Sequence, residues 1–248
     1  MAVTGAGERL FAAFRPAQGV NASFQLELGP DFDATLSRLD ASRRMKKFRA
    51  TARKFDAAGA WRWGEAANQV EALDLFFRQK AARFRAMGLP DVFAKTETKE
   101  FFRRLASTPK RGDDYALRLF TLEIGGNPAR TVAIAGLSRH GHRVTCQFGS
   151  IDDEVLPGSS PGDFLFHLLI ESLSGGGISI FDFGVGDQPY KRAWCNVETA
   201  LYDFMLPLNA KGVAMANAHE AIGHAKRWIK ERPKVYGAIQ SARARFRA

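Results

Sequence analysis

The chain has 248 residues, which is enough for one large domain or two small ones. Hydrophobic residues make up 46% and charged residues 25%, as in ordinary globular proteins, and no apolar run reaches the roughly 18–20 residues of a membrane span. The net charge of +10 leaves nucleic acid, an anionic membrane surface and a polyanionic small ligand open as partners. Two cysteines, Cys146 and Cys195, are too few for a disulfide framework or a metal site, so we expect free thiols, no metal and a cytoplasmic protein.

The first part of the chain predicts a lead-in, a strand and a helix. Residues 1–22 are rich in Ala and Gly without a clear period, and we expect them to be flexible. Alternating apolar and polar residues predict a half-buried strand over 23–28. Apolar residues at helical spacing then predict one helix over 32–58, which Gly59 ends.

A second strand and two further helices follow. The residues from 60 to 65 read as a strand, and the strong apolar period over 68–87 predicts a helix with one buried face. Either Thr96 or Thr98 can cap the next helix, which runs to the break at Pro109.

Three strands in series predict an antiparallel meander over 115–124, 130–138 and 143–148, because short turns separate them. A polar loop then opens a helix over 162–175 with an apolar face, and a strand over 178–183 follows. The helix joins two strands as a crossover, so we expect a mixed sheet.

The end of the chain is predicted to be simpler. After a loop that reaches Trp194, one more strand is expected near residues 198–206. A basic helix is expected from about Ala218 to the end.

The stretch from Ile178 to Trp194 combines a buried strand, an acidic residue, a glycine turn and an aromatic-basic cluster. Asp182 comes at the end of the strand, and Tyr190 and Lys191 follow the turn. Open α/β folds usually place their sites at such strand ends. We therefore expect a functional site here.

The crossover helix begins with Ser159-Ser160-Pro161-Gly162-Asp163. Small residues at a helix start let a phosphate approach the unpaired N–H groups and the positive end of the helix dipole. The same residues also make an ordinary capped helix, and the motif alone does not choose between the two interpretations.

These two segments together resemble a known group of proteins. The helix start at 159–163, followed after the next strand by Asp182-Phe183-Gly184, Tyr190-Lys191 and Trp194, is similar to the acetyltransferase domain of the CelD-like proteins. That group is linked by name to cellulose or exopolysaccharide biosynthesis and belongs to the GNAT superfamily, beside the FemAB-type aminoacyl transferases. The resemblance covers roughly residues 23–207, including the basic helix that begins near Arg43.

The resemblance implies an α+β fold, an α/β mixed sheet that is strongly twisted and flanked by helices, as in GNAT acyl-CoA N-acyltransferases. It implies a GNAT-like acyltransferase domain over 23–207 and a basic helical extension over 208–248. The donor would be acetyl-CoA or another acyl-CoA, and the acceptor an amine or hydroxyl on a small molecule or glycan in polysaccharide or cell-envelope metabolism.

The resemblance also implies roles for particular residues. Tyr190 would be the acid that protonates the leaving thiolate. Apart from the resemblance, the apolar neighbours Phe181 and Phe183 suit Asp182 to the role of a base, and the charge of Lys191 suits it to an oxyanion or phosphate contact. The residues implied in donor binding are Ser159, Ser160, Gly162, Asp163, Gly184 and Gly186.

Other interpretations of these residues stay open. Asp182 can instead accept hydrogen bonds from the backbone of the glycine turn, and Lys191 can form an ion pair with Asp182 or Asp187. Trp194 is expected to be a packing anchor, and His167 a buried imidazole with its hydrogen bonds satisfied.

Two other functions stay open as well. The helix start lacks the usual GNAT glycine-rich loop, so a FemAB-like transferase that uses aminoacyl-tRNA is an alternative. The other is a non-catalytic GNAT-like module that binds proteins or nucleic acid through basic helices such as residues 43–54, although such charge runs are usually solvated helix faces.

Overall fold

The computed structural model describes residues 15–125, 128–152, 154–230 and 232. Contacts divide the chain into two compact units. The larger unit comprises residues 24–184 and 188–197, and it contains every predicted site residue except Gly186. The smaller unit takes the described parts of 1–23, 185–187 and 198–248.

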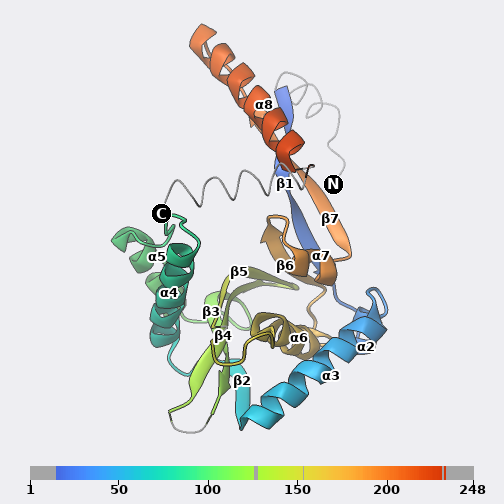
Figure 1. Ribbon diagram of the computed structural model, residues 1–248. Coiled ribbons are helices and arrows are strands. Elements are labelled where there is room, and N and C mark those ends of the chain that lie inside the picture. Colours follow the sequence, from blue (N-terminus) through green and yellow to red (C-terminus); the bar gives the residue numbers. More distant parts are fainter. Residues whose placement is uncertain (1–14, 126–127, 153, 231, 233–248) are drawn as a thin grey trace. The chain divides into compact units, whose positions relative to one another are not determined.

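The elements follow one another along the chain as Figure 1 shows. They are β1 (Arg15–Glu27), α2 (Phe32–Leu36), α3 (Ala41–Ala58), β2 (Trp61–Glu65), α4 (Gln69–Ala86), α5 (Thr96–Ser107), β3 (Tyr115–Ile124), β4 (Arg130–His140), β5 (Arg143–Ile151), α6 (Pro161–Leu173), β6 (Ile180–Val185), α7 (Pro189–Trp194), β7 (Val197–Met205) and α8 (Ala210–Lys230).

Within the described residues the strands form one sheet in the order β2-β3-β4-β5-β6-β1-β7. Strands β2 to β5 are antiparallel neighbours, and β5 pairs with β6 in parallel. Helix α6 makes the crossover between those two strands. The predicted meander, crossover and mixed α+β sheet are therefore confirmed.

An aromatic core lies between helices α4 and α5 and one face of the meander. Phe76 and Phe77 of α4 pack with Phe93, Phe102 and Phe148, and the Phe76 and Phe148 ring centroids are 4.2 Å apart. The helical period predicted for α4 thus marks its buried face. Helix α6 contacts β3, β4 and β5 and carries a run of buried apolar residues.

Gly136 of β4 is needed because Phe148 lies directly across it. A Cβ atom at this position would be 2.3 Å from Cε2 of Phe148, far inside van der Waals contact. The register of β4 against β5 also shifts next to this residue. A glycine inside a strand commonly marks such a bulge or close approach.

The predicted single helix over 32–58 is wrong, because the structure has two helices. Helix α2 ends at Leu36, and α3 begins at Ala41 after a new N-cap, Asp40, whose carboxylate accepts a hydrogen bond from the Arg43 N–H at 3.1 Å. A capping carboxylate satisfies one of the orphan donors of the first turn, so it restarts the helix.

Several boundaries also differ from the predictions. Strand β1 begins at Arg15, so the expected lead-in is already a strand from that residue, and residues 1–14 lie outside the described part. Residues 189–194 form the short helix α7 instead of a loop. Helix α5 is capped at Lys95 without a side-chain hydrogen bond, and neither predicted threonine caps it. Helix α8 begins at Ala210, before the predicted start, and its predicted continuation past residue 232 lies outside the described residues.

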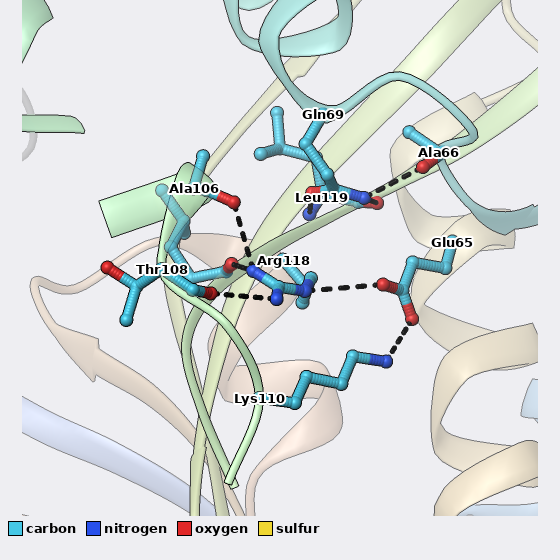
Figure 2. Close-up of polar contacts among 9 residues, drawn as sticks. Glu65, Ala66, Gln69, Ala106, Thr108, Lys110, Arg118 and Leu119 are labelled. Atoms are coloured by element: carbon cyan, nitrogen blue, oxygen red, sulfur yellow. Dashed lines mark hydrogen bonds and ion pairs between the residues drawn. The ribbon is translucent and has the colours of Figure 1, made fainter. Parts of the chain in front are cut away.

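A buried arginine fixes the end of α5 to the sheet (Figure 2). The Arg118 guanidinium donates to the carbonyl oxygens of Ala106 at 3.0 Å and Thr108 at 2.8 Å, and its Nε lies 3.4 Å from Glu65. Lys110 shares Glu65 at 2.7 Å. Orphan carbonyls at a helix end need donors when water cannot reach them, and Arg118 supplies these donors.

We expect Arg118→Met to lower the free energy of unfolding by about 2–4 kcal/mol, because it leaves buried carbonyls without donors. Urea denaturation checks this. Arg62→Met is the matched control, since Arg62 is 76% exposed in its ion pair with Glu123, and its loss should cost less than about 1 kcal/mol. Equal losses for the two variants would contradict this role of Arg118.

Candidate functional site

The site elements gather where the parallel strands β5 and β6 stop pairing. Only three residue pairs connect them, the last being Thr145 with Asp182, although β5 continues to Ile151 and β6 to Val185. The carboxyl ends of the two strands therefore part. Ligands of open sheets commonly bind outside the carboxyl ends of parallel strands.

The start of α6 follows the end of β5 and has an unusual backbone. Ser160 adopts the left-handed conformation, with φ of 55° and ψ of 57°, and Pro161 begins the helix. Gly162 lies so close to Ile151 that a Cβ would be 2.8 Å from its Cγ2. A left-handed serine costs of order 1–3 kcal/mol, and such strained residues cluster at functional sites.

Helix α3 holds the loop before α6 in place. Thr51 donates from its hydroxyl to the carbonyl oxygen of Ser159 at 3.3 Å, and Lys54 donates to that of Gly158 at 3.1 Å. The Ser159 hydroxyl is buried and has no hydrogen-bond partner among the described residues. Helix α3 thus fixes the backbone before α6, while the Ser159 hydroxyl has no hydrogen bond to any described residue.

The Asp163 carboxylate in the first turn of α6 is engaged by three donors. Its Oδ1 accepts from the Trp194 indole at 2.7 Å and from Arg44 at 3.2 Å, and its Oδ2 lies 2.9 Å from the Lys47 ammonium. Burial alone would raise the pKa of Asp163, but Lys47, Arg44 and Trp194 outweigh it, so the pKa lies below its usual value.

His167 is one helical turn further along α6 and is almost fully buried. Its ring stacks on Phe48 of α3 with centroids 3.7 Å apart, and Phe32 meets it edge-on at 5.0 Å. The Nε2 atom has no partner among the described residues, so the expectation of a satisfied imidazole is wrong. Burial lowers the pKa of His167 to about 4.

Asp182 is the third residue of β6 and the last that pairs with β5, not the end of the strand as the sequence predicts, and its side chain is held by three different groups. Its Oδ2 accepts from Arg143 at 2.9 Å and from Gln25 at 3.2 Å, and its Oδ1 accepts from the Gly184 N–H at 2.7 Å. The last contact fixes the glycine turn, where Gly184 has φ of 69°. These contacts favour the turn-holding interpretation of Asp182 over a base.

Tyr190 and Lys191 lie on α7, directly after that turn. The Tyr190 ring stacks on Phe166 of α6 with centroids 5.6 Å apart and an interplanar angle of 10°. Burial raises the pKa of the Tyr190 phenol, which keeps it protonated. Lys191 is buried and donates to the carbonyl oxygen of Gly184 at 3.3 Å, and burial lowers the pKa of its ammonium group.

The two cysteines, Cys146 and Cys195, are free thiols near the site. Burial raises the pKa of both Cys146 and Cys195 to about 12, so both thiols stay protonated at neutral pH. A thiol needs its thiolate form to act as a nucleophile or metal ligand. Neither cysteine is therefore suited to covalent catalysis.

The structure thus brings the predicted residues into two groups. Asp182, Gly184, Tyr190 and Lys191 lie at the end of β6 and on α7, and Gly186, also at positive φ, belongs to the smaller unit. The second group lies at the start of α6. It consists of Ser159, Ser160, Gly162 and Asp163.

Sequence reasoning missed the residues that support these groups. Arg44, Lys47 and Thr51 lie within residues 43–54, for which the charge run predicts a solvated helix face, yet Arg44 is only 7% exposed. A signal was present, because Arg44, Lys47 and Thr51 recur at helical spacing on one side of α3.

The other side of α3 lines an open groove of about 980 Å³. Met45 and Phe48 provide apolar surface there, and Lys46, Arg49 and Arg53 provide positive charge. Within the described part of the chain these three cations take part in no ion pair. This face of α3 agrees with the expected solvated basic face and could also receive an anion.

Among the described residues, no three side chains of His, Cys, Asp or Glu gather at a spacing suited to a metal ion. No described helix is both long and apolar enough to cross a bilayer.

We expect the free energy of unfolding to fall by about 2 kcal/mol between pH 7 and pH 5 through His167. Its pKa is about 4 in the fold and about 6.5 when unfolded, so folding favours the neutral ring. The stabilisation is complete above pH 6.5 and is lost as the pH falls toward 4. Urea denaturation of His167→Leu should lack this share of the pH dependence.

Leu169→Ala is the matched control, because it removes a buried side chain from the same helix without removing a titratable group, so it should lower stability and leave the pH dependence as it is. An unchanged pH dependence in His167→Leu would show that burial does not keep His167 neutral.

Comparisons with known proteins agree with this architecture. A family model described as "Acetyltransferase (GNAT) domain" matches residues 42–192, while a comparison with curated proteins finds no match. Among solved structures, the C-terminal domain (DUF2156) of a protein from Agrobacterium fabrum described as a lysylphosphatidylglycerol synthetase aligns with a TM-score of 0.56 at 13% identity. That alignment covers 86% of this chain and 66% of the other.

Two more solved structures share the fold. FemX aligns with a TM-score of 0.56 at 12% identity over 79% of this chain and 68% of its own, and L-PGS from Bacillus licheniformis with 0.53 at 12% over 88% and 69%. This chain thus spans about two thirds of each of these structures. Identities this low show the fold alone, but the family model matches more than half of the chain. The chain therefore belongs to the acetyltransferase (GNAT) domain family.

Proposed function

We propose that this protein is an acyltransferase that moves an acyl group from an acyl-CoA, most simply acetyl-CoA, to an amine or hydroxyl of a small molecule or glycan. The observation that carries the proposal is the parting of β5 and β6 beyond Thr145 and Asp182. Where these strands part, the polar start of α6 and helix α7, which carries Tyr190, lie at the same end of the larger unit's sheet. Transfer by direct attack requires donor and acceptor to be aligned at one place.

The residues at the start of α6 fit the phosphate groups of such a donor. The positive end of the helix dipole favours an anion, and the buried Ser159 hydroxyl offers a donor that no described residue uses. Ser160 and Gly162 let the backbone be approached closely, and we assign them with Ser159 to donor binding. Gly184, at positive φ, is assigned to donor binding within the larger unit, while Gly186, also at positive φ, belongs to the smaller unit and is not included in this site.

When bound, an acyl-CoA supplies an acyl group activated as a thioester. In the proposed reaction the acceptor attacks the carbonyl carbon, the carbon–sulfur bond breaks, and the leaving thiolate takes up the phenol proton of Tyr190. The acceptor releases its own N–H or O–H proton to water, and the phenol regains a proton from water, so the products are the acylated acceptor and the free thiol. Tyr190 holds its phenol proton before the transfer, since burial keeps the ring in its neutral form. The neighbouring Lys191 is assigned to stabilise negative charge near the reacting carbonyl.

We assign Asp182 a supporting role within this site. Its oxygens already accept hydrogen bonds from Arg143, Gln25 and the Gly184 N–H. A carboxylate with these partners holds the turn that carries the chain from β6 to α7. We do not assign it as the base that deprotonates the acceptor.

The second candidate is a FemAB-like transferase that uses aminoacyl-tRNA. The cations Lys46, Arg49 and Arg53 on α3, which form no ion pair with any described residue, favour it, because nucleic acid binding depends on such positive charge. FemX also shares the fold. A non-catalytic module would use the same cations without transfer.

Thermal unfolding with acetyl-CoA, longer acyl-CoAs and free CoA separates these candidates. A ligand at about 100 times its Kd adds about 2.7 kcal/mol to the free energy of unfolding, so a bound CoA raises Tm. We expect such a shift with acetyl-CoA. No shift with any CoA species, together with RNA binding that weakens steeply with salt, would favour the second candidate.

Tyr190→Phe tests the assigned acid. We expect kcat to fall by about 10²-fold or more while the Kd for acetyl-CoA changes little, because only the proton donor is removed. Steady-state kinetics and calorimetry measure the two quantities. Tyr202→Phe, a change at a 53% exposed ring, is the control and should leave both unchanged. Loss of donor binding in Tyr190→Phe would make Tyr190 a binding residue instead.

A further inference from the structure

Three helices of the larger unit meet at one carboxylate, that of Asp163 on α6. Trp194 reaches it from α7, and Arg44 and Lys47 reach it from α3. The Asp163 side chain is only 16% exposed, and Arg44 is 8% exposed. A buried carboxylate is tolerated when its oxygens are paired and hydrogen-bonded, and here both oxygens are.

Arg44, one of the two cations that contact Asp163, also packs against the face of the Trp194 ring. The Arg44 guanidinium carbon lies 3.9 Å from the centroid of the Trp194 ring, close enough for a cation–π contact. Arg44 therefore contacts both the carboxylate and the indole that donates to it. Trp194 is fully buried, so this contact is shielded from water.

Helix α7 depends on such contacts for its position. It spans only Pro189–Trp194, and helices this short are not stable by themselves in water. Trp194 at its end bonds to Asp163, and Tyr190 near its start stacks on Phe166. Residues four apart on α7 thus contact residues three apart on α6, which are spacings that share one face of a helix.

Two ties of this kind fix how α7 lies along α6. Without the Asp163–Trp194 hydrogen bond, the Tyr190 end of α7 would keep its ring contacts with Phe166 and Phe183 and the Lys191 bond to the Gly184 carbonyl, but the far end of α7 would lose its directional contact with α6. The Asp163–Trp194 hydrogen bond, at 2.7 Å, sets the second point. The orientation of the Tyr190 phenol then depends on the Asp163 carboxylate of α6, which bonds to Trp194 at the other end of α7.

We propose that Asp163 is a positioning residue, which sets the place of Tyr190 by anchoring α7 through Trp194, rather than a ligand of the donor. The inference rests on the proposed function for the role of Tyr190, but the anchoring itself does not. In this proposal the Asp163 carboxylate, although it lies next to the donor site, bonds to protein groups and not to the donor. The donor phosphates are then left to the hydroxyls and backbone of α6.

A double-mutant cycle in the full-length chain tests this. Trp194→Phe removes the indole N–H and keeps an aromatic ring beside Arg44. We expect it to lower kcat by about 10-fold or more, since small misplacements of a reacting group cost this much, with the Kd for acetyl-CoA within about 2-fold. In the Tyr190→Phe background the same change should cost at most about 2-fold, because the group it positions is gone.

Asp163→Asn is the second variant, should Trp194→Phe not fold. It keeps an oxygen for the indole and loses the charge, and we expect the Kd for acetyl-CoA to stay within about 2-fold. Additive effects of Trp194→Phe and Tyr190→Phe on kcat would overturn the proposal. A Kd that rises as much as kcat falls, in either Trp194→Phe or Asp163→Asn, would overturn it as well.

Amide hydrogen exchange separates this inference from the proposed function, because it needs no turnover. Trp194→Phe should speed exchange in α7, residues 189–194, by about 10-fold and leave exchange in α6 unchanged. If exchange speeds up but Tyr190→Phe has full activity, the anchor holds and the acid assignment fails. If exchange in residues 189–194 does not change, the anchor itself is wrong.

Discussion

The burial of one carboxylate imposes a constraint that most of the site depends on. Asp163 lies where water is largely excluded, so its charge must be matched by donors from the protein. Arg44 and Lys47 supply charge from α3, and Trp194 supplies an N–H from α7. The first turn of α6 is consequently fixed with respect to two other helices. The proposed donor-binding turn at the start of α6 and helix α7, which carries Tyr190, therefore both depend on Asp163 for their positions.

The sheet provides the other half of the geometry. Because β5 and β6 pair over only three residues, their ends part just where α6 begins and where the Gly184 turn leads into α7. Asp182 holds that turn through the Gly184 N–H and is itself held by Arg143. Each charged residue at this edge therefore has a structural partner. Tyr190 differs from these residues because burial keeps its phenol neutral, and it is the group that we assign to proton transfer.

The strands of the meander and helices α4 and α6 could be predicted because their apolar period is strong and local. The break before α3 was missed because Leu36 and Leu39 continue the apolar spacing of a helix, while the capping of Asp40 depends on a single side chain. Helix α7 was missed because six residues beginning with proline carry little helical signal. Tertiary contacts stabilise α7, and no local pattern shows them.

The candidate site was predictable in its position but not in its contacts. The strand that carries Asp182 and the helix start at Ser160 are local features that a sequence displays, although β6 continues past Asp182 to Val185. The partner of Arg44 is 119 residues away along the chain, so neither its burial nor the inward orientation of Asp163 could be read from spacing. His167 is similar, because the burial that lowers its pKa comes from tertiary packing, in which Phe48 of α3 stacks on its ring.

Hydrogen exchange of the full chain with and without saturating acetyl-CoA tests the central claim most directly, since it locates the donor without assuming a reaction. The account predicts slower exchange at the start of α6, over residues 158–164, and from the end of β6 into α7, over 183–191, with no change along the exposed face of α3. Protection confined to residues 46–53, or no protection anywhere, would contradict the claim that the parted strands form an acyl-CoA site.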